Sequence, residues 1–270
     1  MVYLDRSPAA PLKGWIRTIW YSRSAGAPHR RERVLPNGCV QIVINLDRDF
    51  IWQCSETART GRLAGALIMG VRSAYEIVDS ADMVEVAGVV FEPGGFASFA
   101  RDAADIFSNR SVALEEVWGP RAKMLRQQML EVPRACAKLC ALESFLLENF
   151  AARLSRNGAV DFALQRFASA QGVAAVRDIA AATGWSERHF SQLFREQVGV
   201  SPKVWLRIQR FQRAVGQLHS GSEVRWAELA VECGYYDQAH FANEFRAFSG
   251  IDATTYSARR GLWVNHVAIE

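Results

Sequence analysis

The sequence predicts an α+β protein, in which a β-rich, barrel- or sandwich-like N-terminal domain with following helices precedes an all-α domain. Three observations lead to this prediction. Short apolar segments separated by turn residues fill the chain up to about residue 95. Apolar residues at helical spacing dominate after that point. Finally, a pattern typical of two helices joined by a glycine turn occurs twice after residue 175.

Composition excludes several classes of protein. The 270 residues carry 32 Lys and Arg against 28 Asp and Glu, for a net charge of +4, and 50% are hydrophobic. These values exclude disorder, collagen and coiled coil for the whole chain. The longest uncharged stretch, Val34–Leu46, contains Pro36 and Gly38 and is too short to span a membrane, so we expect no membrane partner. An N-terminus without an apolar leader and an odd number of cysteines, five, favour the cytoplasm.

The N-terminal strands are predicted from short apolar runs bounded by turns such as Pro36–Gly38 and Pro93–Gly95. The predicted strands are 15–21, 39–46, 50–53, 65–70 and 83–91. Short strands at this spacing are typical of a small barrel or sandwich that can hold one ligand. Four aromatic residues are candidates for lining an effector pocket, with packing in the core as the alternative. They are Trp15, Trp20, Trp52 and Phe91.

Helices are predicted at 96–101, 117–130 and 135–150, and Pro133 separates the last two. The polar stretch that follows ends in Asn-Gly, which indicates a linker. The predicted organisation is therefore a regulatory, effector-binding or dimerisation domain at 1–150, a linker at 151–159 and a helical domain at 160–270.

The repeat is the most informative feature of the chain. Copy one spans 178–202 and copy two spans 228–253. Equivalent residues are Ala180 and Ala230, Gly184 and Gly234, His189 and His240, Phe190 and Phe241, Phe194 and Phe245, Arg195 and Arg246, and Gly199 and Gly250. Two copies are too few for a solenoid, which needs about three or more.

Each copy is predicted to form a helix-turn-helix, at about 176–197 and about 226–248. A glycine ends the first helix, and Ser186 or Asp237 caps the second. The second helix of such a motif enters the major groove of DNA. Ser201 and Pro202 begin a long helix that extends to about Leu218 and joins the two motifs. Two such recognition helices on one side of a duplex lie ~34 Å apart.

The second helix of each copy has a polar face opposite its apolar face, and double-stranded DNA is the predicted partner. Gln and Asn pair with adenine and Arg with guanine, whereas Arg195 and Arg246 are placed for phosphates. The candidate DNA-binding residues are Arg188, Ser191, Gln192, Arg195, Gln238, Ala239, Ala242, Asn243 and Arg246. Candidate phosphate contacts on the joining helix are Lys203, Arg207 and Arg210. A merely solvated helix face is the alternative, and two matched faces weigh against it.

Residues 160–260 resemble the DNA-binding domain of the arabinose-operon-regulator (AraC/XylS) family, with two G-x₄₋₅-H-F-x₃-F-R segments around a Ser-Pro-led helix. LPNGCVQIVINL at 35–46, VAGVVFEPGG at 86–95 and LEEVWG at 114–119 resemble regulatory-domain motifs of one branch. The resemblance implies that the two units read adjacent major grooves. It places base contacts on Arg188, Ser191, Gln192, Gln238, Ala239, Ala242 and Asn243. Copy two departs from the family at Ala253, where proline is usual.

The predicted function is therefore a sequence-specific transcriptional regulator and not an enzyme. We expect no catalytic residue, no metal and no cofactor. Further candidate partners are RNA polymerase, a small-molecule effector and a second copy of the chain. The alternative is a small-molecule-binding or cupin-like metalloenzyme domain fused to a helical interaction module. A cupin metal site needs several histidines, but only His29 precedes residue 189.

Overall fold

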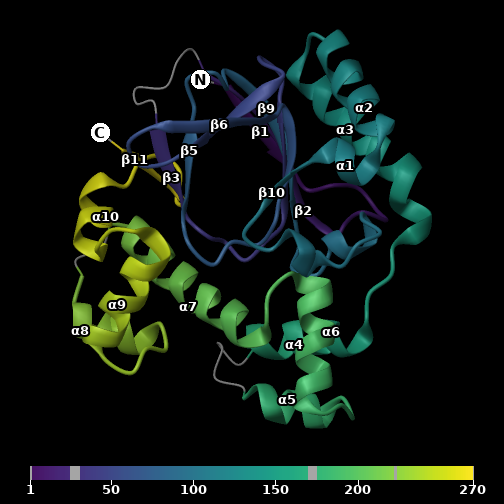
Figure 1. Cartoon of the computed structure of the whole chain (residues 1–270). Coiled ribbons are helices and arrows are strands. Elements are labelled where there is room, and N and C mark those ends of the chain that lie inside the picture. Colours follow the sequence, from purple (N-terminus) through teal and green to yellow (C-terminus); the bar gives the residue numbers. More distant parts are fainter. Residues whose placement is uncertain (1, 25–30, 170–174, 222–223, 270) are drawn as a thin grey trace.

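The computed structural model describes residues 2–24, 31–169, 175–221 and 224–269 (Figure 1). The α+β architecture is the predicted one, with two antiparallel sheets followed by helices. The six-stranded sheet has the order β1 (Val2–Arg6), β2 (Ile16–Arg23), β9 (Glu85–Phe91), β4 (Gln41–Asn45), β7 (Ala66–Met69) and β10 (Ser111–Ala113). The five-stranded sheet has the order β11 (His266–Ile269), β3 (Arg31–Val34), β8 (Glu76–Asp79), β5 (Phe50–Cys54) and β6 (Arg59–Ala64).

Strand β4 lies inside the six-stranded sheet and is buried on both faces. Ile42 is paired with Val89 of β9 on one side and with Ile68 of β7 on the other. Ile42 and Ile44 belong to the main core, whereas Val43 belongs to a smaller cluster shared with Ile51 of the second sheet. This alternation is the expected period of a strand. It explains why β4 reads as a continuous apolar run in the sequence.

The five predicted strands correspond to β2, β4, β5, β7 and β9. The sequence-based prediction missed β1, β3, β6, β8, β10 and β11. Strands β3 (RERV) and β6 (RTGRLA) show why, because they carry few apolar residues. Their place in a sheet depends on partners distant in the chain.

The helices after the first sheet differ in part from the prediction. Residues 96–101 contain only a 3₁₀ turn, η1 (Phe96–Ser98), and a second turn, η2 (Ala104–Phe107), follows. The prediction of a single helix at 117–130 is wrong. Gly119, with φ +63°, separates α1 (Leu114–Trp118) from α2 (Pro120–Glu131). Helix α3 (Ala135–Phe150) has the predicted bounds. The predicted linker contains the 3₁₀ turn η3 (Ala151–Arg153), and helix α4 (Gly158–Ser169) begins at its end.

The C-terminal part is helical apart from its last strand. Its helices are α5 (Val176–Ala182), α6 (Glu187–Val198), α7 (Pro202–His219), α8 (Trp226–Glu232), α9 (Gln238–Ser249) and α10 (Ala253–Arg259). Figure 1 shows α7 running between the group α4–α6 and the group α8–α10. No helix of the described residues has the length and apolar character needed to cross a membrane.

The two halves of the chain share one hydrophobic core. Helix α6 packs against η1 and η2 of the N-terminal half. The amide of Gln212 on α7 donates to the carbonyl oxygen of Pro36 at 2.8 Å. Strand β11, after the last helix, pairs antiparallel with β3. These contacts hold both helix-turn-helix units against the sheets.

Candidate nucleic-acid interface

Both predicted helix-turn-helix units are present, with their turns built as expected. The first helices, α5 and α8, are followed two residues after their ends by Gly184 (φ +76°) and Gly234 (φ +84°), a left-handed conformation that glycine adopts at little cost. The Ser186 hydroxyl accepts from the backbone N–H of His189 at 3.3 Å, and Asp237 accepts from His240 N–H at 2.7 Å. These caps satisfy N–H groups that would otherwise lack a partner at the helix starts.

The apolar faces of the recognition helices α6 and α9 anchor them in the core. Phe190 and Phe194 of α6 are fully buried, and so are Phe241 and Phe245 of α9, to within 2%. A helix whose aromatic face is fixed in this way presents its opposite face outward. The anchors therefore decide which side chains of α6 and α9 face solvent.

Helix α7 is the rigid connector that the sequence predicts. Ser201 caps it by accepting from Val204 N–H at 3.4 Å, and Pro202 occupies the first helical position. The Phe211 ring of α7 lies 5.2 Å from that of Phe245 and 5.1 Å from that of Phe248. Aromatic packing of this kind fixes α9 on α7.

The predicted reading faces are open to solvent. On α6, Arg188, Gln192 and Arg195 are exposed and Ser191 is half-buried. The Gln192 amide donates to Glu196 Oε1 at 2.9 Å, one helical turn away. On α9 the exposed residues are Gln238, Ala239, Ala242, Asn243 and Arg246. Two alanines leave this second face with fewer groups able to hydrogen-bond a base edge than the first.

The basic residues of α7 have protein partners. Arg207 Nε lies 2.6 Å from Glu244 Oε1, and Arg210 Nη2 lies 3.5 Å from Glu244 Oε2. Lys203 Nζ lies 3.6 Å from Glu187 Oε1. A phosphate would have to compete with these carboxylates. Arg207 and Arg210 therefore link α7 to α9 through their ion pairs with Glu244.

Two exposed aromatic residues beside the recognition helices escaped the sequence-based prediction. Trp185 is 46% exposed, and its ring lies 4.4 Å from that of His189. Tyr236 is 89% exposed, and its N–H donates to His240 Nδ1 at 3.3 Å. Tyr236 is the extra residue of copy two, directly before the cap Asp237. The extra residue of copy two was the available signal, because the comparison of the two copies places it within the Tyr235-Tyr236 pair.

The four candidate effector-pocket residues lie in three different surroundings. Phe91 is fully buried in the main core, against Phe96 and Phe99. Trp15 packs at the edge of the same core. Trp20 lies on the smaller cluster between the sheets. Trp52 donates from Nε1 to Asp82 at 2.7 Å and lies under the guanidinium of Arg59. The four residues therefore lie in separate parts of the N-terminal domain.

Burial controls the ionisation of two thiols. It raises the pKa of Cys39 and of Cys233 to about 11. The neighbouring Arg17 and Arg213 oppose this shift in part. Cys136 and Cys140, one helical turn apart on α3, are exposed. No group of three or more His, Cys, Asp or Glu able to hold a metal occurs among the described residues, which do not include His29.

In a comparison with known proteins, the two halves of the chain match two different family models. Residues 179–259 match a family described as a helix-turn-helix domain. Residues 5–113 match a family described as a domain of unknown function (DUF6597). No curated protein matches the chain.

Three solved structures are similar to this chain or to its C-terminal part. The C-terminal domain of AraT, a response regulator from Geobacillus stearothermophilus, is 24% identical over 40% of this chain and 92% of that one, with a TM-score of 0.37. ToxT from Vibrio cholerae is 8% identical over 96% and 98%, with a TM-score of 0.48. The DNA-binding domain of AdpA, in complex with a target DNA, is 25% identical over 38% and 92%, with a TM-score of 0.35. All three TM-scores lie below 0.5.

Proposed function

We propose, from the premise that residues 179–259 form an AraC-type helix-turn-helix domain, that this DNA-binding regulator reads a specific sequence through α6 and α9 together. The observation that carries the proposal is the duplication itself. Two capped recognition helices, each anchored by buried phenylalanines, are fixed to one rigid connector, α7. One chain then contacts two successive major grooves, with half-sites about one helical turn apart.

The proposal gives different roles to the exposed residues of α6. Gln192 pairs with a base edge, after exchanging its bond to Glu196 for one to adenine. Arg195, exposed in the last turn, contacts a phosphate. On α9, Gln238 and Asn243 read bases and Arg246 contacts the backbone. The two alanines of α9 reduce base discrimination in the second half-site.

The N-terminal domain is proposed to receive a signal or to join two copies of the chain. What supports this is its direct contact with both DNA-binding units. Helix α6 packs against η1 and η2, and β11 attaches the end of the second unit to the five-stranded sheet. A conformational change in the N-terminal domain is therefore transmitted to both recognition helices through these contacts.

The test starts with selection of bound duplexes from a random library, using the full chain. We expect an enriched motif with two half-sites. Affinity for the selected duplex should fall steeply between about 50 and 200 mM salt, because bound phosphates release counterions. Failure to enrich a motif, or a flat salt response, would overturn the proposal.

Point variants then separate the roles. Gln192→Ala should cost about 1–3 kcal/mol of binding free energy on the selected duplex and little on a scrambled one. Arg195→Ala should weaken binding to both alike and reduce the salt slope by about one. Gln165→Ala, which removes an exposed amide on α4, outside both recognition helices, is the matched control. Equal losses on both duplexes for Gln192→Ala would contradict its base-reading role.

A further inference from the structure

The exposed faces of α6 and α9 occupy equivalent positions but differ in chemistry. Helix α9 keeps an amide side chain and the arginine of the last turn, but it has alanine where α6 has arginine and serine. The duplicated motif therefore carries two different surfaces on one framework. The equivalent residues are Arg188 and Ala239, Ser191 and Ala242, Gln192 and Asn243, and Arg195 and Arg246.

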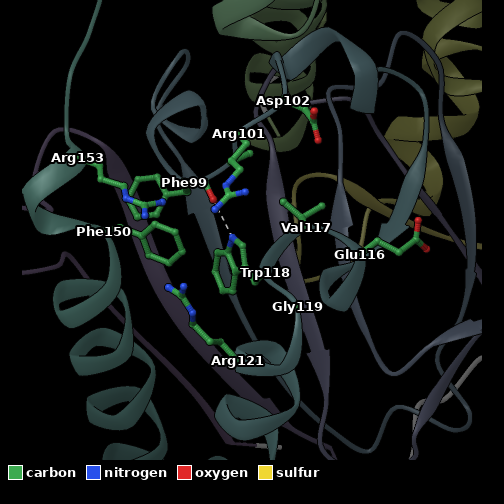
Figure 2. Close-up of a pocket in the computed structure, with 11 residues that line it drawn as sticks. Phe99, Arg101, Asp102, Glu116, Val117, Trp118, Gly119, Arg121, Phe150 and Arg153 are labelled. Atoms are coloured by element: carbon green, nitrogen blue, oxygen red, sulfur yellow. Dashed lines mark hydrogen bonds between the residues drawn. The ribbon is translucent and has the colours of Figure 1, made fainter.

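Both helices are held firmly, so the chemistry of their exposed side chains decides what each can read. The Trp118 Nε1–H donates to the carbonyl oxygen of Phe99 at 2.7 Å and fixes the end of the turn η1 (Figure 2). Helix α6 packs against this turn. On the other side of the domain, the ring of Phe211 on α7 packs against that of Phe245 on α9. Neither helix is free to turn a different face outward.

The outward face of α9 offers methyl and amide groups. Ala239, Ala242 and Asn243 are exposed and are spaced so that they share one side of the helix, and Gln238 is exposed at the first helical position. An alanine adds only a methyl group to the backbone. At two positions of this face the helix can therefore approach the floor of the major groove closely.

Charged groups lie away from the part of α9 that reaches bases. The structure describes every residue from Gln238 to Arg246, and the only carboxylate among them is Glu244. Glu244 is turned toward α7, where it pairs with Arg207 at 2.6 Å. Arg246 lies in the last turn, 4.0 Å from Asp252, whereas the N-terminal residues of a recognition helix contact base edges. This part of α9 thus presents neither a carboxylate for cytosine nor an arginine for guanine.

The groups that α9 does present match adenine and thymine. The C5 methyl of thymine lies in the major groove and accepts apolar contacts from side chains such as alanine, and an Asn or Gln amide pairs with N6 and N7 of adenine. We propose that α9 selects an A·T-rich half-site, with thymine methyl groups against Ala239 and Ala242 and an adenine paired with Asn243. The inference rests on the proposed function and names the bases that its second recognition helix prefers.

Helix α6 has the opposite capacity at its N-terminal end. Arg188 is exposed in the first turn of α6, at the position that Ala239 occupies in α9. An arginine there can pair with O6 and N7 of guanine. The two half-sites are therefore unlike, and one chain binds its site in a single orientation.

Base discrimination by α9 is weaker than that by α6, but it has a direction. Burial of one methyl group favours binding by about three- to fourfold. Two thymine contacts together favour binding by about tenfold. Replacement of a whole base pair in a recognised site costs about fivefold or more.

DNA shape is the alternative source of an A·T preference, because A·T-rich duplexes also differ in minor-groove width and stiffness. Deoxyuridine separates the two explanations. It pairs with adenine as thymidine does and lacks only the C5 methyl group. A preference based on shape survives this replacement, whereas one based on the two alanines is lost.

The test uses the full chain and the duplex selected from the random library. The half-site whose base preference is lost in Asn243→Ala belongs to α9. There, G·C pairs in place of A·T pairs should weaken binding by about fivefold or more. Deoxyuridine at the contacted thymidines of this half-site should weaken binding by about three- to fourfold for each methyl group. The same replacement in the half-site of α6 should have a smaller effect.

A second selection, with Ala239→Arg, transfers the residue of α6 to α9. Ala239 is exposed, so the fold should tolerate the change, and the new motif should contain guanine in the half-site of α9. Ala152→Arg adds the same charge at an exposed position of η3, outside both recognition helices, and should keep the parent motif.

The outcomes distinguish this inference from the proposed function. If no motif is enriched, both are overturned. If a motif with two half-sites is enriched, the A·T preference of α9 is still overturned by any of three results. These are a G·C-rich half-site at α9, binding that is unchanged by deoxyuridine there, and a motif that is unchanged by Ala239→Arg.

Discussion

Glu244 determines what the arginines of α7 do. Its side chain is 11% exposed, and it faces Arg207 at 2.6 Å and Arg210 at 3.5 Å. A buried carboxylate that pairs with two guanidinium groups compensates their charge and links α7 to α9. The basic stretch on α7 is therefore partly neutralised before DNA is bound.

We expect Glu244→Gln to lower the free energy of unfolding by about 1–2 kcal/mol. The change leaves two partly buried cations without a counter-charge, and their partial exposure limits the loss. Urea unfolding of the full chain measures it. Glu228→Gln removes an exposed carboxylate whose i,i+3 partner is Arg225, and should change stability by less than about 0.5 kcal/mol. Unchanged stability with tighter DNA binding would instead mean that Glu244 mainly shields phosphate contacts.

For single residues, the sequence predicts interactions between neighbouring positions well and interactions between distant positions poorly. Ser186, Asp237 and Gly184 act within a few residues of their own positions, so their roles follow from the sequence. Glu244 acts across 37 positions on Arg207, and nothing in the local pattern selects that carboxylate.

Among the elements, α3, the helices of the two helix-turn-helix units and five apolar strands were predictable, because each carries its own periodicity. The five strands are β2, β4, β5, β7 and β9. Strands β3 and β6 were not, since their charged residues suit a sheet only when a partner strand is present. Strand β11 was the hardest strand to predict from the sequence. Its four residues pair with β3, whose residues lie at the other end of the sequence.

Helix α10 provides a pH-dependent test of an element. Hydrogen bonds from the Thr255 N–H and hydroxyl lower the pKa of its cap, Asp252. A carboxyl group with a lowered folded-state pKa stabilises the fold above its unfolded pKa of about 3.9, and this contribution is lost as the pH falls through the folded value. Asp252→Asn keeps the cap but does not titrate.

The stability difference between parent and Asp252→Asn should be constant from about pH 7 to about pH 5, and should shift against the parent below about pH 4. Urea unfolding at matched ionic strength measures this difference. Asp178→Asn, an exposed carboxyl near the start of α5 without a capping role, should show no comparable drift. A difference that does not change with pH would contradict the assigned hydrogen bonds.

In the whole molecule, the ends of both recognition helices face the N-terminal domain. A Cβ placed on Gly199, at the end of α6, would lie 3.3 Å from the carbonyl oxygen of Ala104. A Cβ on Gly250, at the end of α9, would lie 2.4 Å from Cε1 of Tyr75. The Tyr75 hydroxyl donates to Glu56 at 2.8 Å, so the ring is held in place. Each unit therefore contacts the N-terminal domain at a glycine, Gly199 or Gly250. A larger residue at either position would press against a neighbouring atom.

Gly250→Ala and Gly184→Ala form a matched pair that measures this docking. Both glycines have positive φ, at +73° and +76°, so each substitution incurs about 1–2 kcal/mol of backbone strain. Nothing lies within 4 Å of a Cβ on Gly184, whereas Gly250→Ala also clashes with Tyr75. We therefore expect Gly250→Ala to destabilise by about 1–3 kcal/mol more, with faster hydrogen exchange in α9 and β11.

The clash also predicts a coupling. In the background of Tyr75→Ala, which removes the ring, Gly250→Ala should cost no more than Gly184→Ala does in the parent. Urea unfolding of the four chains of this double-mutant cycle, with hydrogen exchange of α9, gives the coupling free energy. The docking would be refuted if Gly250→Ala and Gly184→Ala cost the same in the parent and the cycle showed no coupling. The second unit would then be held by β11 and α7 without the contact between Gly250 and Tyr75.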